Sequence, residues 1–227
     1  VPPFALVYGS PAKVRGYVCK CGAKLPDTWV CGDCGREYFL SPRGVLQDKA
    51  DMKRLPGKHV SLRLVEIDDA EFIVRLRNNE RSRRFLSETS SSVEAQRRWI
   101  SAYKMREAHG EEFYYVIELP DGRPVGLIRI YDLTPEFFSG GSWIIEAGHA
   151  HHIAVETVVL LYDLCFDQLG YRQVLLQVVK ENRSVIKFHQ RFGAVFDRED
   201  EGHVYLINTL ETMQGPRRKF KELLGLR

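Results

Sequence analysis

The chain has 227 residues, with 33 Lys and Arg against 30 Asp and Glu, and 44% of its residues are hydrophobic. This composition is typical of a globular protein, and no apolar run reaches the roughly 20 residues that a membrane helix needs. Residues 1–58 hold 10 basic and 5 acidic residues, whereas residues 59–214 hold 18 and 24. Because the larger part is mildly acidic, we do not expect a nucleic acid as partner.

The N-terminal residues are not expected to form a signal peptide. The chain starts at Val1 rather than Met, and the apolar stretch that follows is short and lacks a basic start. We therefore expect a cytoplasmic protein and a chain that is a fragment or a processed product.

Four of the five cysteines lie within sixteen residues and predict a metal site. They form the pattern Cys19-x-Cys21 and, nine residues later, Cys31-x-x-Cys34. Two close pairs on a short hairpin can bring four thiolates to one tetrahedral Zn²⁺. Such a site has no open position, so the zinc is expected to be structural. Four reduced thiols or two disulfides are the alternative interpretations.

Residues 1–18 carry a second pattern, formed by Pro3, Ala5, Val7, Gly9, Pro11, Ala12 and Lys13. It resembles the closing stretch of left-handed β-helix (hexapeptide-repeat) sugar acyltransferases, some of which carry a zinc ribbon after the last coil. The resemblance implies that residues 1–18 are the tail of such a domain and residues 19–40 a zinc ribbon. A homo-oligomer would follow if a β-helix lies upstream. An extended arm leading into the ribbon is the alternative.

Residues 41–57 are polar, hold two prolines and two glycines, and predict a linker. Regular elements follow over residues 58–212, in the order β-α-α-β-β-β-α-β-α-β-β. The expected strands are 60–67, 113–119, 125–131, 143–145, 173–179, 194–196 and 203–207, and the expected helices are 68–78, 92–109, 153–169 and 184–192. Residues 213–227 are expected to form a basic tail.

The most specific motif follows the strand at 173–179 and runs from Asn182 through Ile186 and His189 to Gly193. It resembles the corresponding segment of the GNAT superfamily of acyl-CoA-dependent N-acetyltransferases, and the resemblance covers residues 58–210. Glu94-x-Gln96-x-x-Trp99 and Gly141-Ser142-Trp143 are similar to the subgroup that acetylates ribosomal proteins, antibiotics and nucleotide-linked amino sugars. The resemblance implies an α/β (α+β) GNAT fold with a mixed central sheet.

Acetyl-CoA is the co-substrate that this resemblance implies. In the family a glycine-rich loop at the start of the central helix holds the CoA pyrophosphate, and residues 150–154 occupy that loop here, with His152 in place of its first glycine. A helix N-terminus still offers free amides and a positive dipole end to a diphosphate. The expected cofactor contacts are Ile144, Ile145, His151, His152, Ile153, Ala154 and Asn182. Alternatively, the histidines at 149, 151 and 152 cap or pack, or bind a metal.

The implied reaction is direct attack of a neutral amine on the thioester. His189 occupies the position where the family often places a Tyr that protonates the leaving thiolate, and a histidine with an ordinary pKa can donate that proton. Glu146 ends the fourth strand and is the expected general base, with Glu118 as the reserve.

The acceptor is expected to be a small amine, in particular an amino sugar that is linked to a nucleotide and used for surface polysaccharide. Arg83, Arg84 and Trp143 are the expected acceptor contacts, and Arg81, Arg97 and Arg98 add positive charge to the same wall. A protein N-terminus or a polyamine is an alternative acceptor. A non-catalytic module that binds a partner is the third hypothesis.

Overall fold

A computed structural model describes residues 1–86 and 90–226, with only the backbone of Arg81 and Ser82. Its centre is an eight-stranded sheet in the order β11-β12-β10-β9-β8-β7-β6-β5. Neighbouring strands are antiparallel except β9 and β10, which are parallel. The sheet is therefore mixed, as predicted. Its strands are β5 (Arg54–Pro56), β6 (Ser61–Leu64), β7 (Phe113–Glu118), β8 (Pro124–Tyr131), β9 (Phe138–Ile145), β10 (Gln173–Val179), β11 (Val195–Glu199) and β12 (His203–Thr209).

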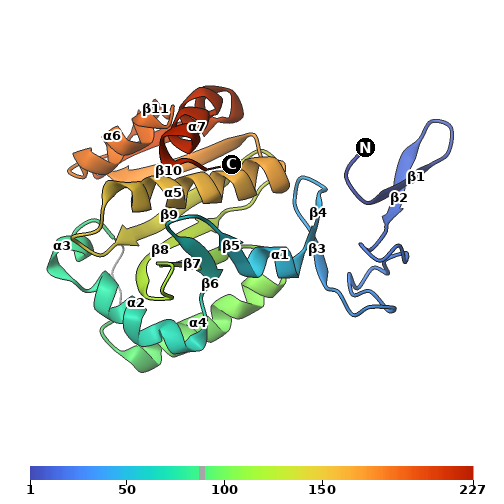
Figure 1. The fold of residues 1–227 in the computed structure, drawn as a ribbon, viewed down its shortest axis with the longest axis horizontal. Coiled ribbons are helices and arrows are strands. Elements are labelled where there is room, and N and C mark those ends of the chain that lie inside the picture. The colour runs from blue at the N-terminus through green and yellow to red at the C-terminus, as the bar shows by residue number, and fades with distance from the viewer. Residues whose placement is uncertain (87–89, 227) are drawn as a thin grey trace.

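Helices cover both faces of this sheet (Figure 1). On one face lie α2 (Ala70–Arg77) and α4 (Val93–Ala108), followed on the same side by the short α3 (Glu80–Arg83). On the other lie α5 (His151–Tyr162), α6 (Arg183–Arg191) and α7 (Leu210–Leu224). A 3-10 turn (Ile67–Asp69) precedes α2, and a π-helical turn (Asp163–Gln168) ends α5.

The two faces have separate cores because side chains of a strand alternate in direction. In β7, Tyr114 and Val116 pack into the core formed with α2 and α4. Phe113, Tyr115 and Ile117 pack into the larger core on the other face, with α5. Every residue of β7 is buried. The sheet is thus covered on both sides, and ligands can reach its centre only where strands part.

The strands part between β9 and β10. These two strands pair over only three residues each, Phe138 to Gly140 with Val174 to Leu176. Beyond that point β9 turns toward β8 through a bulge, where Ser142 has a φ of 47°. The carboxyl halves of β9 and β10 therefore form the two sides of a V-shaped opening, next to the first residue of α5.

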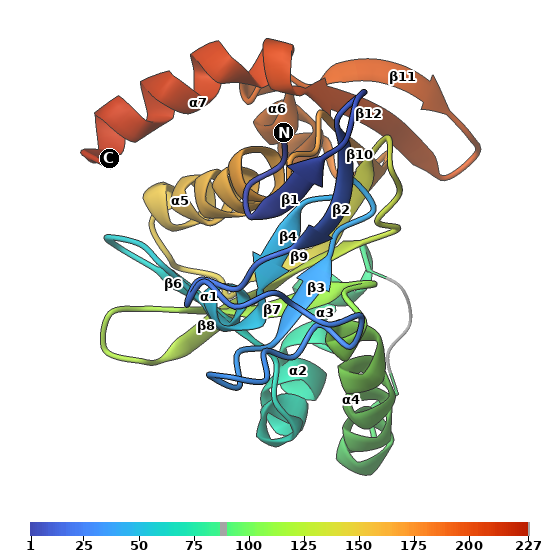
Figure 2. The same cartoon turned by 90° about the vertical axis from the view of Figure 1, so that its right-hand side faces the viewer.

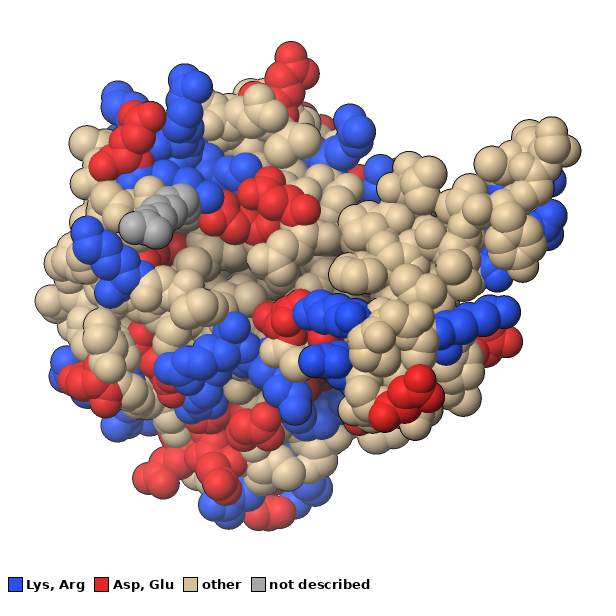
Figure 3. Space-filling view, turned by 45° about the vertical axis from the view of Figure 1, so that its right-hand side comes forward, with Lys and Arg blue, Asp and Glu red and all other residues tan. Residues whose placement is uncertain are grey.

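The N-terminal segment forms a lobe to one side of the body (Figure 1), and Figure 2 views the molecule from that side. It contains two hairpins, β1 (Ala5–Tyr8) with β2 (Lys13–Tyr17) and β3 (Tyr38–Leu40) with β4 (Leu46–Asp48). Tyr17, Leu25, Tyr38 and Leu46 form its own small core around two of the cysteines. Positive and negative side chains are mixed over the face that Figure 3 shows, and they form no continuous basic surface there.

The prediction of a linker at residues 41–57 is wrong, because most of this segment is folded onto the body. Residues 46–56 form β4, the short helix α1 (Lys49–Lys53) and β5, and Met52 and Leu55 belong to the main core. Arg43 donates from Nη1 to the carbonyl of Pro135 at 2.7 Å. The segment resembles a linker because its apolar residues are few, but Leu46, Met52 and Leu55 are buried.

The predicted basic tail is also part of the body. It forms most of α7, whose Met213 is fully buried and whose Phe220 stacks on Phe192 with ring centroids 4.5 Å apart. Two of its cations pair with one carboxylate, Arg217 and Lys221 with Asp163. At its end, Lys58 donates from Nζ to the carbonyl of Leu224 at 3.0 Å. Within the described residues, no helix has the length and apolar character needed to cross a membrane.

Candidate active site

A cavity of about 1310 Å³ occupies the opening between β9 and β10. It extends from the first turn of α5 and the start of α6 to α2 and the residues after α3. Small-molecule sites in proteins usually measure about 300–1,000 Å³. This cavity therefore has room for more than one small molecule, and we treat it as the candidate active site.

Five of the seven predicted cofactor contacts line this cavity: Ile144, Ile145, His151, Ala154 and Asn182. The side chains of Ile153 and His152 lie elsewhere. Ile153 is buried in the main core, and the His152 ring lies 4.7 Å from that of His59. The backbone of both residues still belongs to the first turn of α5, where amides have no partner within the helix. The amide of Ile153 is occupied, because it donates to the carbonyl of Ala150.

The three histidines at 149, 151 and 152 have different neighbours. His149 lies with Nε2 4.0 Å from Oε2 of Glu146, and the His151 ring packs edge-on against Phe188. Across the part of the chain that the structure describes, the four cysteines are the only group of three or more His, Cys, Asp or Glu placed to hold a metal. The alternative of a histidine metal site is therefore not supported.

His189 lies on α6 and faces the cavity, and its side chain is 7% exposed. Its ring lies 5.5 Å from that of Trp143, and its Nδ1 atom is buried without a hydrogen-bond partner. Burial lowers the pKa of His189 from 6.5 to about 4, because the charged imidazolium loses its hydration. The expectation of an ordinary pKa is therefore wrong. Near pH 7 this histidine is neutral and has no imidazolium proton to give.

Glu146 lies one residue beyond β9 and lines the cavity. Its backbone amide donates to the carbonyl of Val125, so the sheet fixes its main chain. Its carboxylate is partly exposed and accepts from Nη2 of Arg75 at 3.2 Å. This carboxylate is thus held at the end of the strand, in reach of a ligand in the cavity.

The reserve base Glu118 is not at this site. It is 6% exposed and pairs with Arg54 and Arg63 among β5 and β6, and it does not line the cavity. The prediction was wrong because Glu118 ends the strand β7, which lies two positions away from the opening in the sheet.

Of the predicted acceptor contacts, Trp143 and Arg84 line the cavity and Arg83 does not. Arg97 and Arg98 are exposed on α4, where both pair with Glu94, and Arg81 lies outside the described side chains. The sequence interpretation missed three residues of the same wall: Arg75, Asn79 and Tyr131. Arg75 lies in α2, Asn79 lies between α2 and α3, and Tyr131 ends β8, so no shared spacing in the sequence pointed to these three residues.

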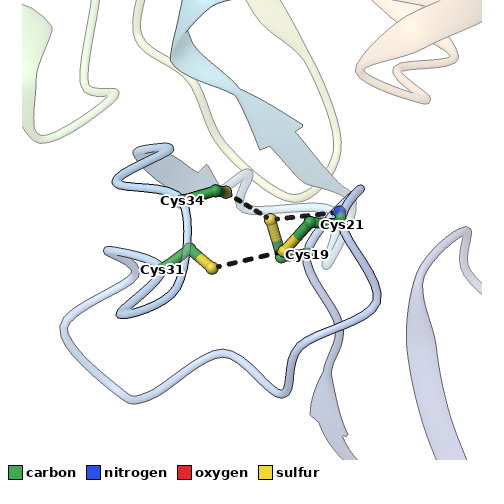
Figure 4. A group of neighbouring side chains, drawn as sticks. All are labelled: Cys19, Cys21, Cys31 and Cys34. Carbon is green, nitrogen blue, oxygen red and sulfur yellow. Dashed lines mark hydrogen bonds between the residues drawn. The ribbon is translucent and has the colours of Figure 1, made fainter.

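The four cysteines converge at the centre of the N-terminal lobe (Figure 4). Their sulfur atoms all lie within 4.8 Å of one another, with 3.5 Å between Cys19 and Cys34 and 3.6 Å between Cys21 and Cys31. Thiolates around a tetrahedral Zn²⁺ at about 2.3 Å lie about 3.8 Å apart. All four are free cysteines in the structure. The donor set therefore fits a four-coordinate zinc.

Comparisons with known proteins agree with this geometry. The sequence of residues 59–195 matches the protein-family model of the acetyltransferase (GNAT) domain. A solved structure described as apo FdhC, a nucleotide-linked sugar GNAT, is 35% identical, with a TM-score of 0.65 over 76% of this chain and 96% of that one. The probable N-acetyltransferase YjcK of Bacillus subtilis is 24% identical over 150 residues, 61% of this chain and 82% of that protein.

A further relative matches a short segment only. It is the dTDP-3-amino-3,6-dideoxy-alpha-D-galactopyranose 3-N-acetyltransferase of Aneurinibacillus thermoaerophilus, 45% identical over 40 residues. The match covers 17% of this chain, and the chain spans about a fifth (21%) of the length of that relative. The domain match, the 35% identical structure and the splayed sheet agree, and the chain belongs to the GNAT family of N-acetyltransferases, whose fold uses acetyl-CoA.

Proposed function

We propose that the chain transfers an acetyl group from acetyl-CoA to the amine of a nucleotide-linked amino sugar. The observation that carries this proposal is the continuous cavity of about 1310 Å³ that joins the first turn of α5 to the arginine-bearing wall of α2. One end suits an acyl-CoA arm and the other suits an acceptor. Both substrates would then meet at the bulge of β9.

At the cofactor end, the amides of the first turn of α5 can take a diphosphate. Ile144 and Ile145 give the pantetheine arm a strand edge and an apolar wall, and Asn182 lies at the start of α6 on the opposite side. The substitution of His152 for a glycine does not block this arrangement, since its ring turns toward His59. Acetyl-CoA supplies the activated acyl group.

At the reacting end, Glu146 is the proposed general base that takes the proton of the attacking amine. Its position beside the acyl site and its fixed backbone support this role. His189 is neutral, so it does not act as an imidazolium acid, and its proposed role is to line the reacting end of the cavity beside Trp143. Proton return to the thiolate then falls to the solvent that enters the open cavity.

The amino-sugar acceptor is supported by the name of the 35% identical relative and by the two arginines of the acceptor wall. A peptide N-terminus or a polyamine would be better matched by an acidic wall.

The small four-cysteine lobe is proposed as a structural zinc ribbon at residues 19–40, preceded by the tail of a β-helix acyltransferase at residues 1–18. The convergence of the four cysteine sulfurs supports the zinc site, and an upstream β-helix would make the protein a homo-oligomer. We also propose that the protein is located in the cytoplasm.

The test is an acceptor panel. Release of CoA thiol is measured with acetyl-CoA and, in turn, nucleotide-linked amino sugars, the free amino sugars, a polyamine and a peptide. Turnover that is highest for the nucleotide-linked compounds supports the proposal. A preference for the peptide or the polyamine would assign that compound, instead of the amino sugar, as the acceptor. Failure to bind acetyl-CoA at millimolar concentration by calorimetry would leave the non-catalytic hypothesis.

A further inference from the structure

The cavity has two chemically different walls. The wall of α5 and α6 offers helix amides and apolar side chains to an acyl-CoA arm. The opposite wall, formed by α2 and the residues after α3, brings Arg75, Asn79 and Arg84 to the same space. Arginine has a planar fork of N–H donors that matches phosphate oxygens in pairs. This second wall therefore has the chemistry of an anion site.

Arg84 is placed for such a contact. Its guanidinium carbon lies 4.6 Å from the centroid of the Phe85 ring, so an aromatic face supports the plane of the group. Among the described residues, no carboxylate pairs with Arg84. Its donors can therefore turn to a ligand of the cavity without breaking an ion pair of the described chain.

Arg75 joins the anion site to the reacting end. It stacks over Phe72 at 5.5 Å and donates from Nη2 to Glu146 at 3.2 Å. The Arg75 side chain is 67% exposed, and an exposed pair of this kind adds little stability by itself. One guanidinium carries five N–H donors, so Arg75 can keep Glu146 in place and bind a phosphate with the remaining ones.

We propose that Arg75 and Arg84 form the subsite for the diphosphate of the acceptor, while Glu146 faces the amine of its sugar. This inference rests on the proposed function and adds the residues that select a nucleotide-linked acceptor over the free amino sugar. The diphosphate then lies at the α2 wall, the sugar spans the cavity, and the amine reaches the bulge of β9. The acceptor is recognised by its charge at one end and its amine at the other.

The experiment uses Arg84→Ala and Arg84→Lys, with Arg83→Ala as the matched control. Arg83 is the preceding residue, is also exposed, and does not line the cavity. For each protein, kcat and KM are measured for a nucleotide-linked amino sugar, for the free amino sugar and for acetyl-CoA. Inhibition by uridine diphosphate is measured as well.

We expect Arg84→Ala to raise KM for the nucleotide-linked acceptor by about 10- to 100-fold, the usual effect of a lost charged hydrogen bond. KM for acetyl-CoA and for the free sugar should change less than about twofold, and Arg84→Lys should recover part of the loss because lysine keeps the charge without the fork. Arg83→Ala should behave as the wild type. Uridine diphosphate should compete with the acceptor and should lose affinity in Arg84→Ala, less so in Arg84→Lys, and not in Arg83→Ala.

Two results overturn the inference while the proposed function stands. One is an unchanged KM for the nucleotide-linked acceptor in Arg84→Ala. The other is a rise in KM for acetyl-CoA, which would assign Arg84 to the phosphates of the cofactor. If the wild type binds acetyl-CoA but turns over no nucleotide-linked acceptor and does not bind uridine diphosphate, the proposed function and the inference both fail.

Discussion

Phe39 joins the four-cysteine lobe to the acetyltransferase body, and its removal should destabilise the whole chain. Its side chain is 5% exposed, and its ring lies 5.4 Å from that of Phe113 in β7. Gly110 lies directly beneath, where a Cβ atom would come within 2.5 Å of the ring. Replacing such a buried Phe by Ala costs about 3–5 kcal/mol. For a chain of this length, 1 kcal/mol corresponds to about 2–4 °C in Tm. We therefore expect Phe39→Ala to lower Tm by roughly 6–20 °C.

The assay is thermal unfolding of the wild type and the variant, followed by circular dichroism and by calorimetry. Val30→Ala is the control, since Val30 lies in the same lobe with 43% of its surface exposed, and its Tm should change by less than about 2 °C. A flexible tether between lobe and body predicts a different result. The body would then unfold at an unchanged temperature in Phe39→Ala, and that outcome would refute the argument for a docked lobe.

Three further results are expected. Glu146→Gln should lower kcat by about 100-fold or more with little change in KM for acetyl-CoA, because the base is lost; steady-state kinetics showing less than a twofold loss would exclude Glu146 as the base. The free energy of unfolding should fall by about 3 kcal/mol as the pH drops from 6.5 to 4, because His189 with its pKa lowered to about 4 stays neutral in the folded chain while its unfolded counterpart takes up a proton. Urea unfolding at several pH values measures this, and His189→Gln should flatten the slope. The purified wild type should hold one zinc per chain by elemental analysis and Cys31→Ser much less; a metal-free wild type purified without chelator would contradict the zinc site.

Local sequence signals predicted most of the body. The Asp121-Gly122 turn joins β7 and β8 as expected, with Gly122 at a φ of 84°. Ser92 caps α4 by accepting from the amide of Ala95, again as expected. These elements were predictable because their turn residue or cap lies within a few residues of the element that it defines.

The first half of β9 could not be predicted in this way. Residues 138–142 are rich in Gly and Ser, which favour loops in isolation. In the fold Gly140 lies against Leu176 of β10, and a Cβ atom at Gly141 would come within 2.9 Å of the Tyr131 hydroxyl and 3.1 Å of its ring. Similarly, Gly215 and Pro216 argue against a helix, yet α7 continues through them because Met213 and Phe220 are packed on the body. Tertiary packing decided both elements.

In the candidate site, too, some features follow from local sequence motifs and others only from tertiary packing. The cofactor contacts were placed by a motif, and most of them line the cavity. The acceptor wall depends on which helix residues face the opening, so Arg83 and Arg84 could not be separated from sequence, and Arg75 was missed. The neutral state of His189 depends on burial by Trp143 and Phe188, which no local pattern reveals.

The hydrogen bond from Lys58 to the carbonyl of Leu224 places the start of the acetyltransferase body next to its end. Gly225, in the left-handed conformation at the end of α7, comes so near that a Cβ atom there would lie 3.0 Å from the Lys58 ammonium. Domains whose entry and exit points are adjacent accept circular permutation and insertion into a host loop. Residues before Lys58 also belong to the body, because β5 extends its sheet and Met52 and Leu55 lie in its main core. A host loop that receives this body therefore has to receive residues 46–57 with it, and the entry point lies at β4 rather than at Lys58.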